Sequence, residues 1–242
     1  DVMQVPVGDL FKAAIVPGVM LVLAYLAYIV VFAMIKGDKA PSIGDKPTKA
    51  QVIEALKAVV PPMMLILFVL GSIFAGIATP TESSSIGAVG AVLLAFMYKK
   101  LTLDIIKGAA LQTVKITSMV FAILIGATAF SMVFTYTGGD MIVEEFMTAL
   151  PAGEYGFLIA SMLIVFLLGF FLDFVEICFI VVPILGAIAL NLGVDPVWFA
   201  ILIAVNLQTS FLTPPFGFSL FYLKGVVPEG VRTIDIYKGV IP

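Results

Sequence analysis

Long apolar runs alternate with short polar stretches along the chain. A transmembrane helix needs about 20 mostly apolar residues, and two runs reach this length without a break. They are residues 11–35 and 116–135. Four further apolar stretches contain polar or helix-breaking residues. They are residues 61–78, 86–98, 155–190 and 197–227. The pattern predicts an all-α, polytopic membrane protein.

Two polar stretches have the spacing of short amphipathic helices at a membrane surface. They are residues 48–60 and 228–242. Together with the apolar runs they predict four segments. The first is a transmembrane helix with a cytoplasmic loop and an interfacial helix, and the second is a helix pair around "TPTE". The third holds a hairpin and a broken helix, and the fourth is a last interfacial helix. These segments are residues 1–60, 61–115, 116–227 (hairpin 155–190, broken helix 196–227) and 228–242.

Composition supports a membrane protein. The 242 residues are 62% hydrophobic and 12% charged, whereas a soluble domain is about half apolar and a quarter charged. The sequence has no basic patch that would suggest nucleic-acid binding. The chain has no histidine, which disfavours imidazole-bound metals and a Ser-His catalytic pair. Its single cysteine, Cys178, excludes an intrachain disulfide.

The basic residues predict a topology. Twelve of the 13 Lys and Arg residues fall in residues 36–57, 99–115 and 224–238, and the positive-inside rule places these clusters in the cytoplasm. Lys12 is the exception. Residues 155–190 would then start and end outside, as two thin spanning helices or as a re-entrant hairpin. The charges near the middle favour the hairpin, with its tip at residues 173–183.

Three acidic residues lie inside apolar segments, namely Glu82, Asp173 and Glu176. A charge there costs at least about 2.5 kcal/mol on insertion scales, so each one needs a partner or a polar cavity. Glu82 is explained equally well as part of a helix N-cap with Thr79 or Thr81. Asp173 either ties the hairpin tip together as an acceptor or takes part in binding an ion or substrate.

The stretch "NLQTSFLTPPFG" interrupts the last apolar run. Pro214 and the proline after it free backbone carbonyls. Nearby polar side chains come from Asn206, Thr209, Ser210 and Thr213. Carbonyl and hydroxyl oxygens suit a cation such as Na⁺, and broken helices near the bilayer midplane are typical of secondary transporters. A simple proline kink between packed helices is the alternative.

Several stretches together resemble one known family. "GSIFAGIATPTESSSIGAVGA", "LDFVEICFIVVPIL" and "LGVDPVWFAILIAVNLQTSFLTPPFGFSLF" are similar to motifs of the large membrane subunit of tripartite ATP-independent periplasmic (TRAP) transporters. Their order and spacing run over essentially the whole chain. The chain resembles the second half of that subunit, with the end of the first half, and both ends look cut.

The resemblance implies an elevator-type transporter driven by sodium, in the inner membrane of a bacterium. It implies two partners, a small membrane subunit and a periplasmic protein that delivers a small organic acid. It also implies no cofactor besides Na⁺. A sodium site would draw on Glu176, Ile177, Ile180, Thr209 and Thr213. Substrate binding or gating would draw on Asp173, Ser210, Asn206, Thr81, Glu82 and Pro214. Glu176 departs from the family, where a less acidic stretch follows the hairpin aspartate.

Two alternatives belong to other classes. An intramembrane enzyme could use Asp173 and Glu82 as a carboxylate pair, but no hydrolase motif is visible and the two motifs approach from opposite sides. A non-transporting membrane scaffold would have no use for charged residues and helix breaks in apolar segments. A transporter, and not an enzyme, is therefore the expectation.

Overall fold

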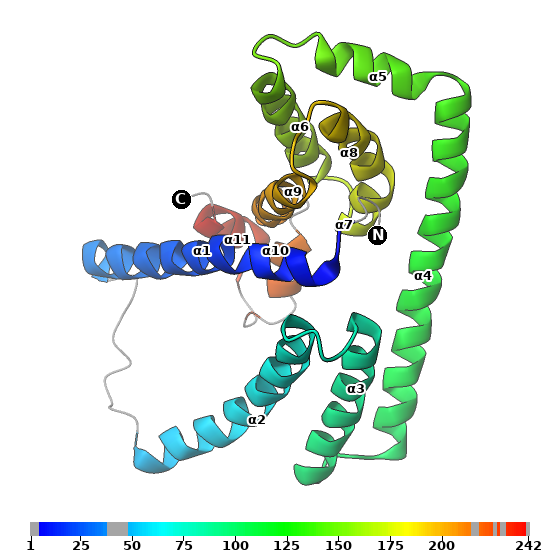
Figure 1. Ribbon diagram of the computed structural model, residues 1–242. Helices are drawn as coiled ribbons and strands as arrows, with labels where there is room; N and C mark the ends of the chain where they lie inside the picture. Colours follow the sequence, from blue (N-terminus) through cyan, green and yellow to red (C-terminus); the bar gives the residue numbers. More distant parts are fainter. Residues whose placement is uncertain (1–4, 38–47, 214–217, 225–226, 228–230, 241–242) are drawn as a thin grey trace. The chain divides into compact units, whose positions relative to one another are not determined.

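The computed structural model describes residues 5–37, 48–213, 218–224, 227 and 231–240 (Figure 1). All regular secondary structure in these ranges is helical, as the sequence predicts. Five of the described helices are long and apolar enough to cross a membrane. The chain divides into two compact units, residues 7–112 and residues 113–242 together with 1–6.

The first unit holds α1 (Val7–Ile35), α2 (Lys49–Phe74), α3 (Pro80–Met97) and the start of α4 (Leu103–Tyr136). Helix α1 confirms the predicted helix at 11–35, and Phe11 packs its ring edge-on against Phe74 of α2. Helix α4 is longer than predicted, because it begins well before the apolar run at 116–135.

The expectation of a separate helix at 48–60 is wrong, because α2 continues through Pro61 and Pro62. A proline in a helix leaves the carbonyl four residues earlier without its amide donor, which for Pro61 is the carbonyl of Lys57. The hydroxyl of Tyr98 donates to this carbonyl oxygen at 2.8 Å. A side chain from the neighbouring helix thus replaces the bond that Pro61 cannot make, which helps the helix to continue.

We expect Tyr98→Phe to destabilise the α2–α3 pair by about 1 kcal/mol, the typical net value of one hydrogen bond. Thermal unfolding of the purified permease measures this change. Tyr28→Phe is the control, since Tyr28 lies on α1 and its described contact is with the ring of Phe32. Equal unfolding temperatures for the two variants would contradict this role of Tyr98.

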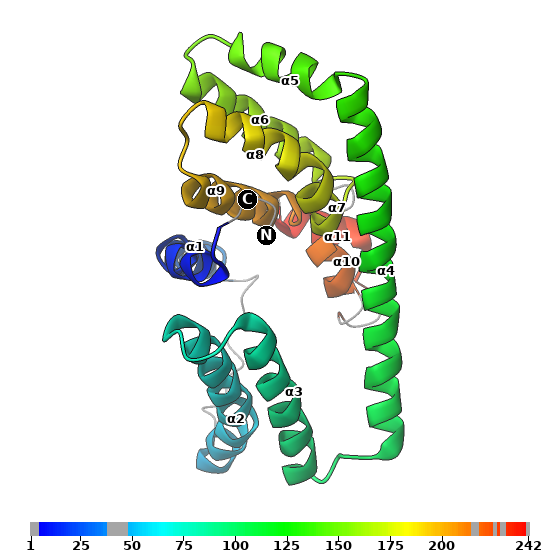
Figure 2. The same cartoon turned by 45° about the vertical axis from the view of Figure 1, so that its right-hand side comes forward.

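Helices α2 and α3 lie side by side in both views (Figures 1 and 2). The hydroxyl of Ser72 on α2 and that of the buried Ser83 on α3 are 2.8 Å apart and share a hydrogen bond. Gly90 of α3 faces Leu65 so closely that a Cβ atom would collide with the leucine side chain. A small residue at this position therefore permits the close approach of the two helices.

The second unit contains the rest of α4 and the remaining helices. They are α5 (Gly139–Thr148), α6 (Glu154–Leu168), α7 (Phe174–Glu176), the π-helical turn η2 (Ile177–Val181), α8 (Val182–Asn191), α9 (Pro196–Ser210), α10 (Phe218–Lys224) and α11 (Thr233–Val240). Helix α5 lies between the apolar run at 116–135 and the predicted hairpin at 155–190. Helix α11 falls in the predicted segment 228–242, and its position at an interface stays a prediction.

The core of the second unit lies where α6, α8 and α9 pack together (Figure 2). Phe157 of α6 and Phe199 of α9 are fully buried, and their ring centroids are 5.7 Å apart. Ile177 of the π-helical turn is also fully buried in this cluster. The same core therefore fixes the hairpin and the helix that precedes the "TPPFG" break.

Candidate functional site

The predicted hairpin at 155–190 is a helical hairpin. Helix α6 is its first limb, and α7, η2 and α8 form one apolar helical limb, Phe174–Asn191. The turn between the limbs spans residues 169–173. The prediction that the tip lies at 173–183 is therefore wrong, because residues 174–183 already belong to the second limb.

Asp173 begins the second limb as its N-cap. Its carboxylate oxygen Oδ1 accepts from the backbone N–H of Phe174 at 2.6 Å. In return the backbone N–H of Asp173 donates to Oε2 of Glu176 at 3.2 Å. This reciprocal capping box supplies partners to backbone N–H groups that the helix itself leaves unpaired. It confirms the interpretation of Asp173 as an acceptor that ties the turn together.

The carboxylate of the capping aspartate can accept more hydrogen bonds than the cap uses. Asp173 is half-buried, and its side chain accepts from the backbone N–H of Phe174 and, in the capping box, from that of Glu176. An ionised carboxylate has about four lone-pair sites, so Asp173 can cap the helix and still bind a cation or water.

In the first unit, Glu82 occupies the capping-box position that Glu176 occupies in the second, the third residue of its helix. Its Oε2 atom accepts from the backbone N–H and the hydroxyl of Thr79, both at 2.8 Å. The N–H of Glu82 donates to the hydroxyl oxygen of Thr79 at 3.3 Å. Thr79, and not Thr81, is therefore the N-cap of α3. Thr81 is exposed, and its carbonyl accepts from the hydroxyls of Ser84 and Ser85.

A π-helical turn follows the cap of the second limb. The N–H of Val182 donates to the carbonyl of Ile177, five residues earlier. Pro183 has no N–H to donate. The carbonyl four or five residues earlier, at Phe179 or Cys178, therefore accepts no backbone hydrogen bond from residue 183. Such turns occur frequently at functional sites. Ile180 is half-buried in this turn.

The broken helix at 196–227 is interrupted as predicted. Helix α9 ends at Ser210, a turn covers 211–213, and α10 begins at Phe218. Pro214 lies outside the described residues. Three hydroxyls at the end of α9 donate to backbone carbonyls one turn earlier. The pairs are Thr209 to Val205 (3.2 Å), Ser210 to Leu207 (3.0 Å) and Thr213 to Thr209 (2.9 Å). Because each hydroxyl uses its proton in this way, its oxygen lone pairs remain available for a cation.

The hairpin and the end of α9 meet at Gly169. Ser210 is fully buried and lies so close to Gly169 that a Cβ atom there would overlap its hydroxyl. One turn earlier on α9, Nδ2 of Asn206 donates to the carbonyl of Met162 on α6 at 2.6 Å. The structure thus brings Ser210 and Asn206 against the first limb and the turn. No hydrogen bond joins Thr209 or Thr213 to residues 173–181 in the described ranges.

Sequence reasoning missed two features of this region. The first is Gly169, which ends a 15-residue apolar helix and could have been noticed as a glycine at a helix end. The second is a row of hydroxyls on α4, formed by Thr128, Ser131 and Thr135. With Phe179 of the π-helical turn, this row lines an open cavity of about 480 Å³. These hydroxyl residues are spaced three and four residues apart within an apolar run, a spacing that places them on one face of a helix and could have indicated the row.

The fold defines the chain as an all-α, polytopic membrane protein. A helical hairpin packs against an interrupted helix, hydroxyls and a capping carboxylate lie at the two breaks, and such an arrangement is typical of membrane transporters. Residues 2–242 match the family described as the tripartite ATP-independent periplasmic transporter, DctM component. The chain belongs to this family, which confirms the resemblance seen in the sequence.

Three relatives show the range of the family. The C4-dicarboxylate TRAP transporter large permease protein of Rhodobacter capsulatus is 32% identical over 95% of this chain and 52% of its own length. The isethionate TRAP transporter permease protein of Oleidesulfovibrio alaskensis is 30% identical over 99% of this chain and 37% of its own length. The sialic acid TRAP transporter permease protein of Haemophilus influenzae is 29% identical over 98% of this chain and 38% of its own length.

The chain thus spans about half, or less, of the length of these relatives. They are named as transporter permeases, which places the chain among transporter subunits and not among enzymes. Family membership and the five candidate spans identify it as a multi-pass protein of the bacterial inner membrane. A catalytic carboxylate pair is not needed to explain Asp173 and Glu82, because each belongs to a capping box.

Proposed function

We propose that this chain forms part of a sodium-coupled permease that imports small organic acids by an elevator movement. The observation that carries the proposal is the contact between the hairpin turn and the end of α9, through Gly169 and Ser210. Two helix breaks that touch can share one ion, and an ion held by both would lock the hairpin against the broken helix. The locked unit would then move across the membrane as a rigid body.

The sodium ligands we propose are oxygen atoms at the two breaks. Glu176, Ile177 and Ile180 belong to the second limb, while Thr209 lies at the end of α9 and Thr213 in the turn that follows it. Na⁺ is a hard cation, and carbonyl, hydroxyl and carboxylate oxygens suit it. The carbonyl of Ile177 already accepts from Val182 and would bind the ion through its second lone pair.

We assign substrate binding or gating to residues around the same breaks and to the "TPTE" motif. They are Asp173, Ser210, Asn206, Pro214, Thr81 and Glu82. A carboxylate substrate is favoured by the positive N-terminal end of a helix and by neutral hydrogen-bond donors. Relatives named for C4-dicarboxylates, isethionate and sialic acid support an acidic substrate.

The partners we propose are a small membrane subunit and a periplasmic substrate-binding protein. Membership of a tripartite family supports both. The test is uptake by the complete permease that contains this chain, reconstituted in vesicles with both partners. A panel of dicarboxylates, sialic acid and sulfonates is offered under an inward Na⁺ or K⁺ gradient. Uptake of at least one acid with Na⁺ and none with K⁺ is expected, whereas no uptake of any acid would favour a scaffold.

We expect Thr213→Val to lower the apparent affinity for Na⁺ in this uptake assay by about two- to tenfold, the typical value of one lost hydroxyl contact. Valine keeps the shape of threonine and removes the hydroxyl. Thr137→Val is the matched control, because the Thr137 hydroxyl also donates to a carbonyl four residues earlier, at 2.9 Å. An identical Na⁺ dependence in both variants would remove Thr213 from the sodium site.

A further inference from the structure

An apolar groove of about 510 Å³ lies between α2 and α3 in the first unit. This volume falls in the range of sites for small molecules, about 300–1,000 Å³. Most of its lining is aliphatic, and one aromatic and one cationic residue complete it. The lining residues are Ile53, Leu56, Lys57, Val60, Pro61, Leu94, Met97 and Tyr98.

Tyr98 places one end of this groove at the membrane surface. It is the C-cap residue of α3 and follows a long apolar helix. Tyrosines at such positions lie at the level of the lipid headgroups, and the hydroxyl of Tyr98 is fixed there by the carbonyl of Lys57. From Lys57 and Tyr98, at the headgroup level, the groove extends towards the hydrocarbon at Val60 and Leu94, while Ile53 and Leu56 line the part before Lys57.

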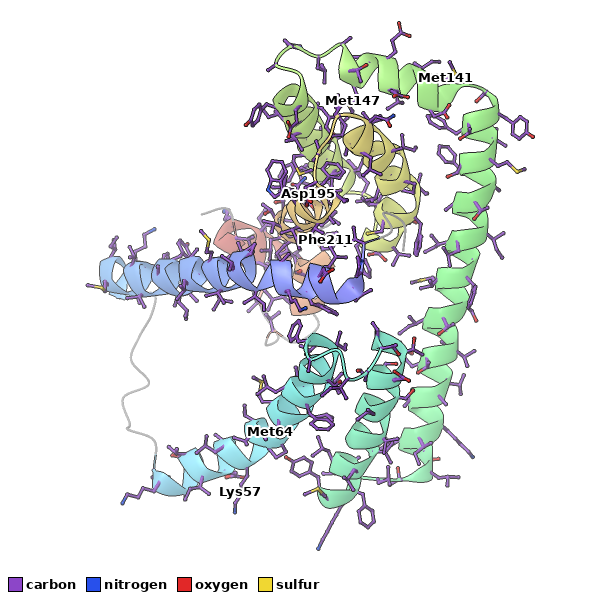
Figure 3. The ribbon with its side chains drawn as sticks, in the orientation of Figure 1. Lys57, Met64, Met141, Met147, Asp195 and Phe211 are labelled. Atoms are coloured by element: carbon purple, nitrogen blue, oxygen red, sulfur yellow. The ribbon has the colours of Figure 1, made fainter. Side chains whose placement is uncertain are left out.

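The end of the groove at the surface is positively charged. Lys57 lies exposed on α2 (Figure 3). It lines the groove, and Lys99 and Lys100 directly follow Tyr98. In the described ranges, none of these three ammonium groups has an ion pair with a carboxylate. Glu54 is the single acidic residue of α2, so the positive charge here is not neutralised.

We propose that this groove binds an anionic phospholipid. One acyl chain would occupy the aliphatic lining, and the phosphate would accept hydrogen bonds from Lys57, Lys99 and Lys100. Basic pockets between transmembrane helices bind anionic headgroups in this way.

The length of the groove favours a lipid over a helix of another subunit. Residues 53 to 61 cover about 12 Å of α2 at 1.5 Å per residue, whereas a spanning helix would need a seam along about 30 Å. The unpaired lysines are a second argument, because an apolar partner helix would have no use for them at the groove.

Native mass spectrometry of the complete permease tests the proposal without sodium or substrate. The purified complex is exposed to equal amounts of phosphatidylglycerol and phosphatidylcholine with the same acyl chains. We expect bound phosphatidylglycerol to exceed phosphatidylcholine. Lys57→Gln should reduce this preference by about fivefold, and the further changes Lys99→Gln and Lys100→Gln should reduce it again by a similar factor each.

The control is Lys115→Gln, which removes the same charge from α4 at a residue that does not line the groove. Equal binding of the two lipids to the unaltered protein, or an equal loss with Lys115→Gln, would overturn the proposal.

Leu94→Trp fills the groove and should release the bound lipid of either kind. An unchanged amount of bound lipid in a folded Leu94→Trp complex would place the lipid elsewhere. These results do not depend on transport, so they separate this inference from the proposed function.

Discussion

We expect Gly169→Ala to destabilise the second unit by about 1–3 kcal/mol, the usual cost of overpacking a core. The new Cβ atom would overlap the hydroxyl of Ser210 and lie 2.8 Å from its Cβ atom. The backbone gives no reason for a loss, because Gly169 has φ −63° and ψ −9°, which alanine adopts readily. Alanine would even gain about 0.5–1 kcal/mol over glycine in a helix, so a net loss must come from the collision.

Two variants make this prediction specific. Gly126→Ala, on α4, has no atom within 4 Å of the new Cβ and should leave the unfolding temperature unchanged or slightly raised. Adding Ser210→Gly to Gly169→Ala removes the colliding side chain and should restore most of the lost stability. Uptake should fall with Gly169→Ala. If Gly169→Ala unfolds at the same temperature as Gly126→Ala, the hairpin turn does not touch α9 as described.

The helices that sequence predicted well are those set by one local property. The apolar run at 11–35 is long enough to require a helix that spans the bilayer, and α1 is that helix. The prolines after Thr213 cannot continue a helix without lost hydrogen bonds, and α9 ends at Ser210, shortly before them. In both cases the residues that carry the sequence pattern lie in, or within a few residues of, the helix or helix end that the pattern predicts.

The errors arose where a distant or reciprocal contact decides the structure. Pro61 does not end α2, and the hydroxyl that satisfies the freed Lys57 carbonyl comes from Tyr98, which is 41 residues away. The predicted hairpin tip, residues 173–183, begins later in the chain than the turn at residues 169–173. The prediction is wrong because the charges of Asp173 and Glu176 suggest a loop. Asp173 and Glu176 instead use those charges to begin a helix. Such charges are compatible with an ion site and with a cap, and only the geometry shows the capping role.

The contact between Gly169 and Ser210 could not be predicted for a similar reason. It joins residues that are far apart in the chain, and it depends on how α6 and α9 pack around Phe157 and Phe199. The sequence predicted polar groups at each break. It could not predict which of them meet, and Asn206 and Ser210 are the members of the predicted set that reach the first limb.

Replacing Asp173 should have the largest effect on transport, and two substitutions separate its two roles. Asp173→Asn keeps a side-chain oxygen that can accept from the N–H of Phe174, so we expect stability within a few tenths of a kcal/mol of the unaltered protein. The negative charge is lost, and an interaction with a charged group is worth about 1.5–3 kcal/mol. Na⁺-driven uptake at limiting Na⁺ should therefore fall at least about tenfold.

Asp173→Ala removes the cap as well as the charge, so it should lose the same uptake and a further 0.5–2 kcal/mol or so of stability. The matched control is Asp195→Asn, because Asp195 is the N-cap of α9 (Figure 3) and its Oδ1 accepts from the N–H of Trp198 at 2.8 Å. This variant changes the same charge at the same kind of cap and should keep normal uptake. Suppose instead that Asp173→Asn transports normally and that only Asp173→Ala is impaired, in proportion to its lost stability. Asp173 would then be a cap alone, and the ion that closes the hairpin would have to be held by the carbonyls of the second limb and the hydroxyls of α9.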